Sequence, residues 1–319
     1  MSEMVYQRNV YGKTLVELGK QRKDIVVFDA DLSGSTRTAF FQSQFPERFF
    51  NFGIAEQNMF AAASGMASCF KTVFVSTFAM FATGRAWDQV RNSICYSNLN
   101  VKIVATHAGI TVGPDGATHQ AIEDIALMRV IPNMKILVPC DGPQTKEAIL
   151  LAAKISGPVY VRLGRPKVPT IGMYGDFAIG KSDVLTKGFD AAIFACGIMV
   201  KYALDAQKEL LTQGIECSVI NMYSLKPIDK EIIESMAKKV KGIVVCEEHS
   251  MIGGLGSAVA SVVLEKGYAV PLKKIGINDR FGQSGELEDL LKEYLLQPED
   301  IVAAVKKVLS MSAHTPSDL

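Results

Sequence analysis

The sequence has no long apolar run, no excess of charge of either sign and no close pair of cysteines. Its 34 Lys and Arg residues balance 33 Asp and Glu residues, so there is no overall basic footprint for nucleic acid. No apolar stretch approaches the roughly 18 residues that a membrane span needs, and the first residues lack the apolar core of a signal peptide. We therefore expect a cytoplasmic protein that binds neither nucleic acid nor a membrane.

The cysteines and the chain length limit the class of protein further. The six cysteines are far apart and form no C-x-x-C pair: Cys69, Cys95, Cys140, Cys196, Cys217 and Cys246. Because most of them have apolar neighbours, we predict buried, reduced and structural thiols. With 319 residues, 48% of them hydrophobic, the chain is long enough for two domains with substantial cores.

Short apolar runs alternate with segments of helical spacing through most of the chain. In the first half the runs are 25–28, 72–77, 101–105, 135–139 and 159–163. This alternation predicts an α/β fold whose parallel sheet is covered by helices on both faces. Proline and glycine interrupt the pattern between Gly164 and Gly188, and a second alternating unit follows. We predict one domain at 1–168, a linker at 169–188 and a smaller domain at 189–319.

The loop that follows the run 101–105 is the strongest candidate for a site. It contains His107, Asp115 and His119 together with three glycines that allow close approach to a ligand. Polar groups at the carboxyl end of a strand in an α/β sheet are typical of a polar-substrate site. The alternative is that the histidines are solvated or capping residues.

Three further segments carry candidate residues. Polar side chains follow the run 25–28, Glu56 begins an Ala-rich helical segment, and Phe78 and Phe81 follow the run 72–77. Glu56 has a structural alternative, since an acidic residue at a helix N-terminus complements the helix dipole. The two phenylalanines have one as well, because aromatics three residues apart after a strand commonly pack into a core.

The second half offers weaker signals. Gly253–Gly256 fails the G-x-G-x-x-G spacing of a nucleotide loop and predicts a tight turn from strand to helix. His249, beside Glu247 and Glu248, is predicted to be a hydrogen-bonded residue at a domain contact.

Five motifs in order resemble the C-terminal half of transketolase, a thiamine diphosphate enzyme that transfers two-carbon ketol units between sugar phosphates. The motifs are Asp31–Ser35, Gly53–Asn58, Ser76–Phe81, Thr106–Gln120 and Arg162–Arg165. The resemblance spans nearly the whole chain. It implies two three-layer α/β domains, a pyrimidine-binding domain followed by a smaller transketolase C-terminal domain.

The resemblance also implies roles in cofactor binding. Glu56 resembles the carboxylate that hydrogen-bonds the aminopyrimidine of thiamine diphosphate and activates the cofactor. Phe78 and Phe81 resemble the aromatics that stack on that ring. Where many members have a third aromatic, this chain has Gly84, and the segment after it is closer to deoxyxylulose-phosphate synthase.

The remaining implied roles concern the sugar phosphate. His107 and His119 are similar to the pair that contacts the substrate and moves its protons, and Asp115 to the residue that senses a sugar hydroxyl. Arg8, Ser35 and Arg165 resemble the site for the substrate phosphate, since a guanidinium fork suits phosphate oxygens.

One family motif is missing from the chain. We find no Gly-Asp-Gly, which in this family helps to hold the cofactor diphosphate through a divalent metal, Mg²⁺ or Ca²⁺. The resemblance therefore implies one subunit of a split transketolase, with an N-terminal partner subunit that carries the diphosphate-binding domain. We expect a dimer of heterodimers that acts in the pentose phosphate pathway.

Alternatives remain within and outside the enzyme class. Deoxyxylulose-phosphate synthase resembles the chain closely, but it has Asp-Arg at the place of Thr106–His107. The beta chain of a 2-oxo acid dehydrogenase has a similar length and domain order, but it lacks a segment like 115–120. A noncatalytic regulatory subunit is the alternative from another class, and the presence of Glu56, His107 and His119 together argues against it.

Overall fold

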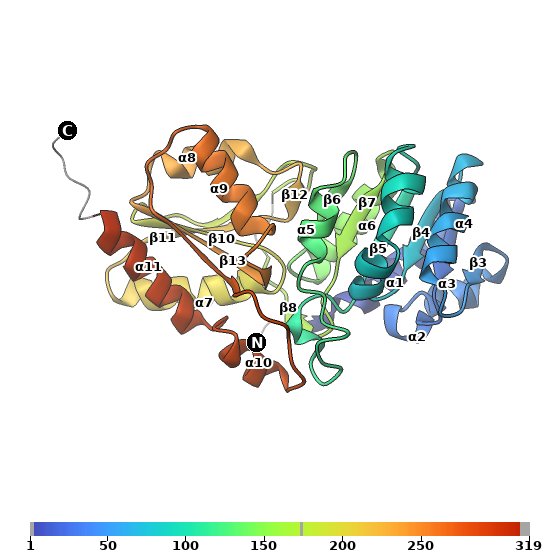
Figure 1. Cartoon of the computed structure of the whole chain (residues 1–319), viewed down its shortest axis with the longest axis horizontal. Coiled ribbons are helices and arrows are strands. Elements are labelled where there is room, and N and C mark those ends of the chain that lie inside the picture. The colour runs from blue at the N-terminus through green and yellow to red at the C-terminus, as the bar shows by residue number, and fades with distance from the viewer. Residues whose placement is uncertain (1–2, 173–174, 313–319) are drawn as a thin grey trace.

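Two α/β domains lie side by side in the computed structural model, which describes residues 3–172 and 175–312 (Figure 1). The fold class predicted from the sequence is confirmed. Each domain is built on one main sheet whose central strands are buried on both sides, because helices cover both faces.

The first sheet has the strand order β12-β6-β7-β5-β4-β2-β3. Its members are β2 (Ile25–Asp29), β3 (Phe49–Asn51), β4 (Thr72–Ser76), β5 (Val101–Ala105), β6 (Lys135–Leu137), β7 (Val159–Arg162) and β12 (Ser224–Lys226). Six strands are parallel, whereas β12 runs antiparallel to β6. Since β12 comes from the second half of the chain, one sheet joins the two domains.

Helices cover the two faces of this sheet as a three-layer domain. One face packs against α1 (Gln7–Gln21), α3 (Ala39–Gln44) and α6 (Gly142–Lys154). The other packs against α4 (Glu56–Ser68), α5 (Asp124–Arg129) and the π-helical segments η2 (Phe81–Arg85) and η3 (Gln89–Cys95). Alternate strand residues face opposite layers: Ile25 and Val27 pack with the first group, Val26 and Phe28 with the second.

The second sheet has the order β14-β13-β10-β11-β9. Its strands are β9 (Asp183–Thr186), β10 (Ala191–Ala195), β11 (Cys217–Asn221), β13 (Gly242–Ser250) and β14 (Leu272–Ile277). The helices are α7 (Met199–Thr212), α8 (Lys230–Ala237), α9 (Leu255–Glu265), α10 (Leu287–Glu293) and α11 (Pro298–Ser312). In this sheet only β9 is antiparallel among the described strands.

The predicted parallel sheets also contain antiparallel strands at their edges. Strands β9 and β12 pair antiparallel, and β9 lies within the predicted linker segment. A separate two-stranded ribbon joins β1 (Met4–Tyr6) to β8 (Lys167–Pro169). These strands are three or four residues long, and most of them contain Lys, Asp or Pro. They therefore lack the apolar run from which a strand can be predicted. The domain boundary itself stays a prediction.

One hydrophobic core cluster extends across the two domains. A single buried cluster contains Ile125 and Ile136 from the first domain and Phe194 and Val259 from the second. Five cysteines are buried as predicted, whereas Cys69 is exposed, and all six lie outside disulfides. Among the described helices, none is long and apolar enough to cross a membrane.

Candidate active site

Most of the predicted site residues follow the carboxyl ends of adjacent strands of the first sheet. The short helix α2 (Ser33–Thr36) follows β2, Phe78 follows β4, His107 follows β5 and Arg165 follows β7. Because parallel strands all end at the same edge, residues far apart in sequence meet there. Their side chains form a row of contacts that begins at Glu56 and ends at Arg8.

His107 lies at the centre of the row. It is 3% exposed and has a positive φ of 58°, a strained conformation that is common at functional sites. Its ring stacks on Phe78 with centroids 3.9 Å apart. Nδ1 lies 2.8 Å from Thr106 Oγ1, and Nε2 lies 3.4 Å from Arg8 Nη1.

The tautomer of His107 follows from these contacts. Burial, with help from Arg8 and Arg165, lowers the pKa of His107 to about 3, so the ring is neutral near pH 7. Arginine can only donate, so Arg8 Nη1 donates to Nε2, which leaves the proton on Nδ1 to be donated to Thr106 Oγ1.

His119 and the phenylalanines continue the row. The His119 ring meets Phe81 edge-on, with centroids 5.3 Å apart, and Nδ1 lies 2.9 Å from Thr118 Oγ1. Phe78 and Phe81 are nearly parallel, with centroids 6.0 Å apart. His119 is half-buried whereas His107 is enclosed, so the two predicted histidines have different access to solvent.

Glu56 lies at the other end of the row and is ion-paired. It begins α4 and is 2% exposed, and its Oε2 accepts from Arg85 Nη1 at 2.9 Å. The Arg85 guanidinium also lies over the Phe81 ring, 4.6 Å from its centroid. Arg85 was not among the predicted site residues. A cation following the Phe81 motif was its only signal in the sequence.

Arg8 and Arg165 line a cavity of about 310 Å³. Tyr6, Lys167 and Glu286 also line it, and none of these three was predicted. Arg8 Nη1 donates to the Ser35 carbonyl oxygen at 3.3 Å, so the predicted phosphate residues lie together. Arg8 Nε is buried and has no hydrogen-bond partner among the described residues. Burial, and then the neighbouring Arg37, lower the pKa of Arg8.

Asp115 is the predicted residue that the structure does not bring into this row. Its side chain is exposed and makes no hydrogen bond or ion pair within residues 3–172 and 175–312. The same described ranges contain no group of three or more His, Cys, Asp or Glu side chains that could hold a metal ion.

The glycine run and His249 have the structural roles that the sequence favoured. Gly254 precedes α9, and the Glu247 carboxylate accepts from the backbone N–H groups of Leu255 and Gly256 at 2.6 and 2.8 Å. A carboxylate already fills this helix N-terminus. His249 is buried, and its Nε2 accepts from Ala126 N–H of the first domain at 3.3 Å.

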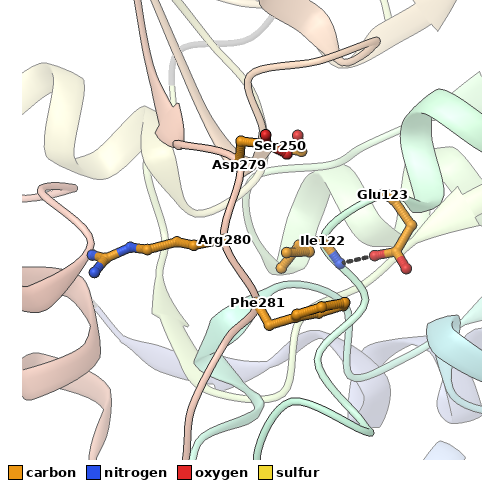
Figure 2. Close-up of a pocket in the computed structure, with 6 residues that line it drawn as sticks. All are labelled: Ile122, Glu123, Ser250, Asp279, Arg280 and Phe281. Carbon is orange, nitrogen blue, oxygen red and sulfur yellow. Dashed lines mark hydrogen bonds between the residues drawn. The ribbon is translucent and has the colours of Figure 1, made fainter.

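A second cavity, of about 240 Å³, contains none of the predicted site residues (Figure 2). It lies where Ile122 and Glu123 of the first domain face Phe281 of the second. Figure 2 shows the Glu123 carboxylate turned back to the Ile122 N–H, which donates to it at 2.8 Å. Arg280 points away from this cavity, and its Nη1 pairs with Glu293 at 2.9 Å.

Comparison with known families gives a match for each domain. Residues 3–170 match the transketolase pyrimidine-binding domain, and residues 180–301 match the transketolase C-terminal domain. The chain belongs to the transketolase family. The resemblance drawn from the five motifs is therefore confirmed.

Similar proteins include other chains of this length. A putative transketolase C-terminal section from Methanocaldococcus jannaschii is 52% identical over 302 residues, which cover 93% of this chain and 94% of that one. A 6-deoxy-6-sulfo-D-fructose transketolase subunit from Clostridium sp. is 39% identical over 302 residues, covering 94% of both. A solved structure described as a split-gene transketolase, inactive beta4 tetramer, superposes with a TM-score of 0.88 at 50% identity, covering 97% of this chain and 100% of that one. The chain thus corresponds to the C-terminal section of a transketolase.

Proposed function

We propose that this chain is the C-terminal subunit of a thiamine-diphosphate-dependent transketolase that moves a two-carbon ketol unit from a ketose phosphate to an aldose phosphate. The row of contacts from Glu56 through Phe81, Phe78 and His107 to Arg8 carries the proposal. It combines a buried carboxylate, two aromatic faces, a neutral imidazole and a cation in one place.

The residues at the Glu56 end fit the aminopyrimidine of the cofactor. Glu56 Oε2 is paired with Arg85, and Oε1 accepts no hydrogen bond from the described residues, so one carboxylate oxygen is available to a ring N–H. Phe78 and Phe81 offer apolar faces beside it. When bound, the cofactor would supply a nucleophilic carbon. Glu56 would share a proton with the ring, a role that needs an acid because an amide cannot take it.

The residues at the Arg8 end fit an anionic, hydroxylated substrate. Arg8 and Arg165 would hold the phosphate, and the buried, unpaired Arg8 Nε–H is a donor without a partner among the described residues. His107 would orient the sugar as a neutral group, since its pKa of about 3 keeps it uncharged. His119, which is half-buried, would donate to or accept from the ketol oxygens. Asp115, whose side chain is exposed, would meet a sugar hydroxyl from the solvent side of the loop.

The partner would supply the diphosphate and metal site. The chain has no Gly-Asp-Gly motif, and a diphosphate is held in such enzymes through Mg²⁺ or Ca²⁺. The similar protein described as a split-gene transketolase supports a two-subunit enzyme, and its description as an inactive tetramer of beta chains supports the need for a second subunit. We propose a dimer of heterodimers in the cytoplasm.

Reconstitution tests this function. The chain is mixed with an N-terminal subunit, thiamine diphosphate and Mg²⁺, and ketol transfer from xylulose 5-phosphate to ribose 5-phosphate is assayed alongside a 6-sulfonated ketose donor. We expect transfer by the mixture and none by the chain alone. Glu56→Gln should lower kcat at least ~100-fold, whereas Glu47→Gln, at an exposed carboxylate, should not. Full activity of the chain alone would contradict the split-subunit proposal.

A further inference from the structure

The second domain places one buried carboxylate against the candidate substrate loop of the first. Glu248 lies near the end of β13 and is 3% exposed. Its Oε1 accepts a hydrogen bond from the backbone N–H of Thr111 at 2.7 Å. Thr111 lies between His107 and His119, in the short 3-10 turn η4 (Ile110–Val112). A buried N–H without this acceptor would lose its only described partner.

The loop is shaped to receive this carboxylate. Gly109 has a φ of +83°, and a Cβ on it would overlap the carboxylate carbon and oxygens of Glu248. A side chain other than glycine would therefore collide with the carboxylate, besides adopting a backbone conformation that L residues rarely take. Glu248 thus both accepts a hydrogen bond from Thr111 and packs closely against Gly109. The position of Glu248 therefore limits the position of the loop.

Glu248 is itself fixed by a buried ion pair. Its backbone oxygen accepts from Arg162 Nη2 at 3.0 Å, and Arg162 Nε donates to Asp124 at 2.7 Å. Arg162 and Asp124 are both buried. Asp124 also accepts from the Tyr160 hydroxyl, and it begins α5, the helix that follows His119. The ion pair thus ties Glu248 to the segment that leaves the loop.

The neighbouring residue of the turn connects this anchor to the phosphate site. The Val112 carbonyl oxygen accepts from Arg165 Nη1, one residue after the Thr111 N–H that Glu248 holds. A shift of η4 would therefore move Arg165 within the cavity that it lines with Arg8. Within the described residues, Glu248 does not line this cavity and makes no hydrogen bond to Arg8, Phe78 or His107, so we expect its effect to pass through the turn.

We propose that Glu248 is a positioning residue through which the second domain sets the substrate loop and the phosphate-binding Arg165. The effect of Glu248 on catalysis rests on the proposed function. Its effect on the position of the loop does not. The substrate group that this contact would help to place is the anionic one that Arg165 binds, which is the phosphate in the proposed function.

Three variants of the full chain test the loop directly. Glu248→Ala removes the acceptor. Glu248→Gln keeps an oxygen that can accept from Thr111 N–H. Glu247→Gln changes the adjacent buried carboxylate, which holds the N-terminus of α9 and makes no described contact with the loop. Amide hydrogen exchange is measured over residues 107–120 and, as an internal reference, over β10.

We expect residues 107–120 to exchange roughly tenfold faster in Glu248→Ala, and within about threefold of the parent in Glu248→Gln and Glu247→Gln. Unchanged exchange in Glu248→Ala would overturn the proposal, as would an equal acceleration of the loop in Glu247→Gln. If Glu248→Ala does not fold, Glu248→Asp takes its place, since the shorter side chain withdraws the carboxylate from Thr111 and keeps the charge.

Kinetics of the complex with the N-terminal subunit test the catalytic consequence. Glu248→Ala should raise KM for the phosphorylated donor about tenfold, with a smaller change in KM for a donor without phosphate. Glu248→Gln should keep the KM of the parent. Faster exchange with an unchanged KM would overturn the role in substrate positioning. An inactive parent complex would refute the proposed function alone, since the exchange result still decides the role of Glu248 in the loop.

Discussion

Two loops of the candidate site are held by buried carboxylates. One carboxylate is close to its loop in the sequence, and the other is far from it. In the loop after β2, Asp29 accepts from Leu32 N–H at 2.6 Å and from the hydroxyls of Thr36 and Thr38, each at 2.8 Å. All of these residues lie within nine positions of Asp29. In the loop after β5, the carboxylate comes from Glu248, 137 positions beyond Thr111 and in the other domain.

The difference shows that the two walls of the site depend on different parts of the fold. The loop that carries Ser35 is set by its own strand, so it should form wherever the first sheet forms. The loop that carries His107 and His119 is complete only when the second domain is packed against the first, because its central N–H has no other described partner. One wall is local and the other depends on domain packing.

Removal of the local anchor should have the largest effect on stability. Asp29→Ala leaves one backbone N–H and two hydroxyls without their acceptor in a buried place, which costs about 3 kcal/mol of the free energy of unfolding. Urea denaturation of the full chain measures it. Asp29→Asn is the control and should lose less, because its oxygen can still accept from Leu32. Equal losses for the two variants would contradict a local anchor.

A pair of glycine substitutions contrasts the loops directly. Gly109→Ala should lower the free energy of unfolding by about 2 kcal/mol. The residue has a positive φ, and the added Cβ would meet the Glu248 carboxylate. Gly34→Ala, in the loop after β2, has nothing within 4 Å and no positive φ, so it should stay within about 0.5 kcal/mol of the parent. Both are measured by urea denaturation. A neutral Gly109→Ala would show that the loop does not need the close approach of Glu248.

The pH dependence of stability should differ in sign between the loops. The pKa of His107 is lowered to about 3, mainly by burial, so below about pH 6.5 the unfolded chain binds a proton that the folded chain does not. Stability should fall with acidification between about pH 6.5 and 3, by up to ~1.4 kcal/mol per pH unit. Burial raises the pKa of Asp29, so its contribution is instead lost as the pH rises through its folded-state pKa.

Denaturation at a series of pH values checks this sign. His107→Asn cannot titrate, so its stability should fall less steeply than that of the parent between about pH 6 and 4, the range in which His107 is protonated in the unfolded chain but not in the folded one. Asp29→Asn should not reduce that slope. The same slope in parent and His107→Asn would mean that His107 does not titrate as its burial predicts.

The smallest effect is expected at the outer end of the His loop. Ser284 of the second domain donates from Oγ to the Pro114 carbonyl oxygen at 2.6 Å, in an exposed position. Ser284→Ala should lower stability by about 0.5 kcal/mol, because water replaces the lost donor. Ser261→Ala, on the exposed face of α9, serves as the control. If Ser284→Ala lowers stability as much as Gly109→Ala does, the loop is held at Pro114 rather than at Glu248.

The sequence was most informative where one element carries its own signal. The apolar runs predicted β4, β5 and β10 because a strand buried on both faces needs consecutive apolar residues. The edge strands β9 and β12 lack such runs: each is only three or four residues long, and β9 alternates buried residues with exposed or half-buried ones. Among site residues, the family resemblance named His107, Phe78 and Arg8, which the structure brings into contact, but it did not separate Asp115, which is exposed.

The contacts between chemically complementary groups were decided only by the tertiary structure. Nothing near Glu56 in the sequence indicates that Arg85, 29 positions later at the end of η2, pairs with it. Likewise, Glu248 carries no sequence signal for Thr111, because their contact depends on how two separately formed sheets pack. The sequence alone determined the alternation of strands and helices, the two domains and the identity of the polar groups, since these follow from local periodicity and residue chemistry. The distances between those groups depended on the packing of the shared core, which no local pattern encodes.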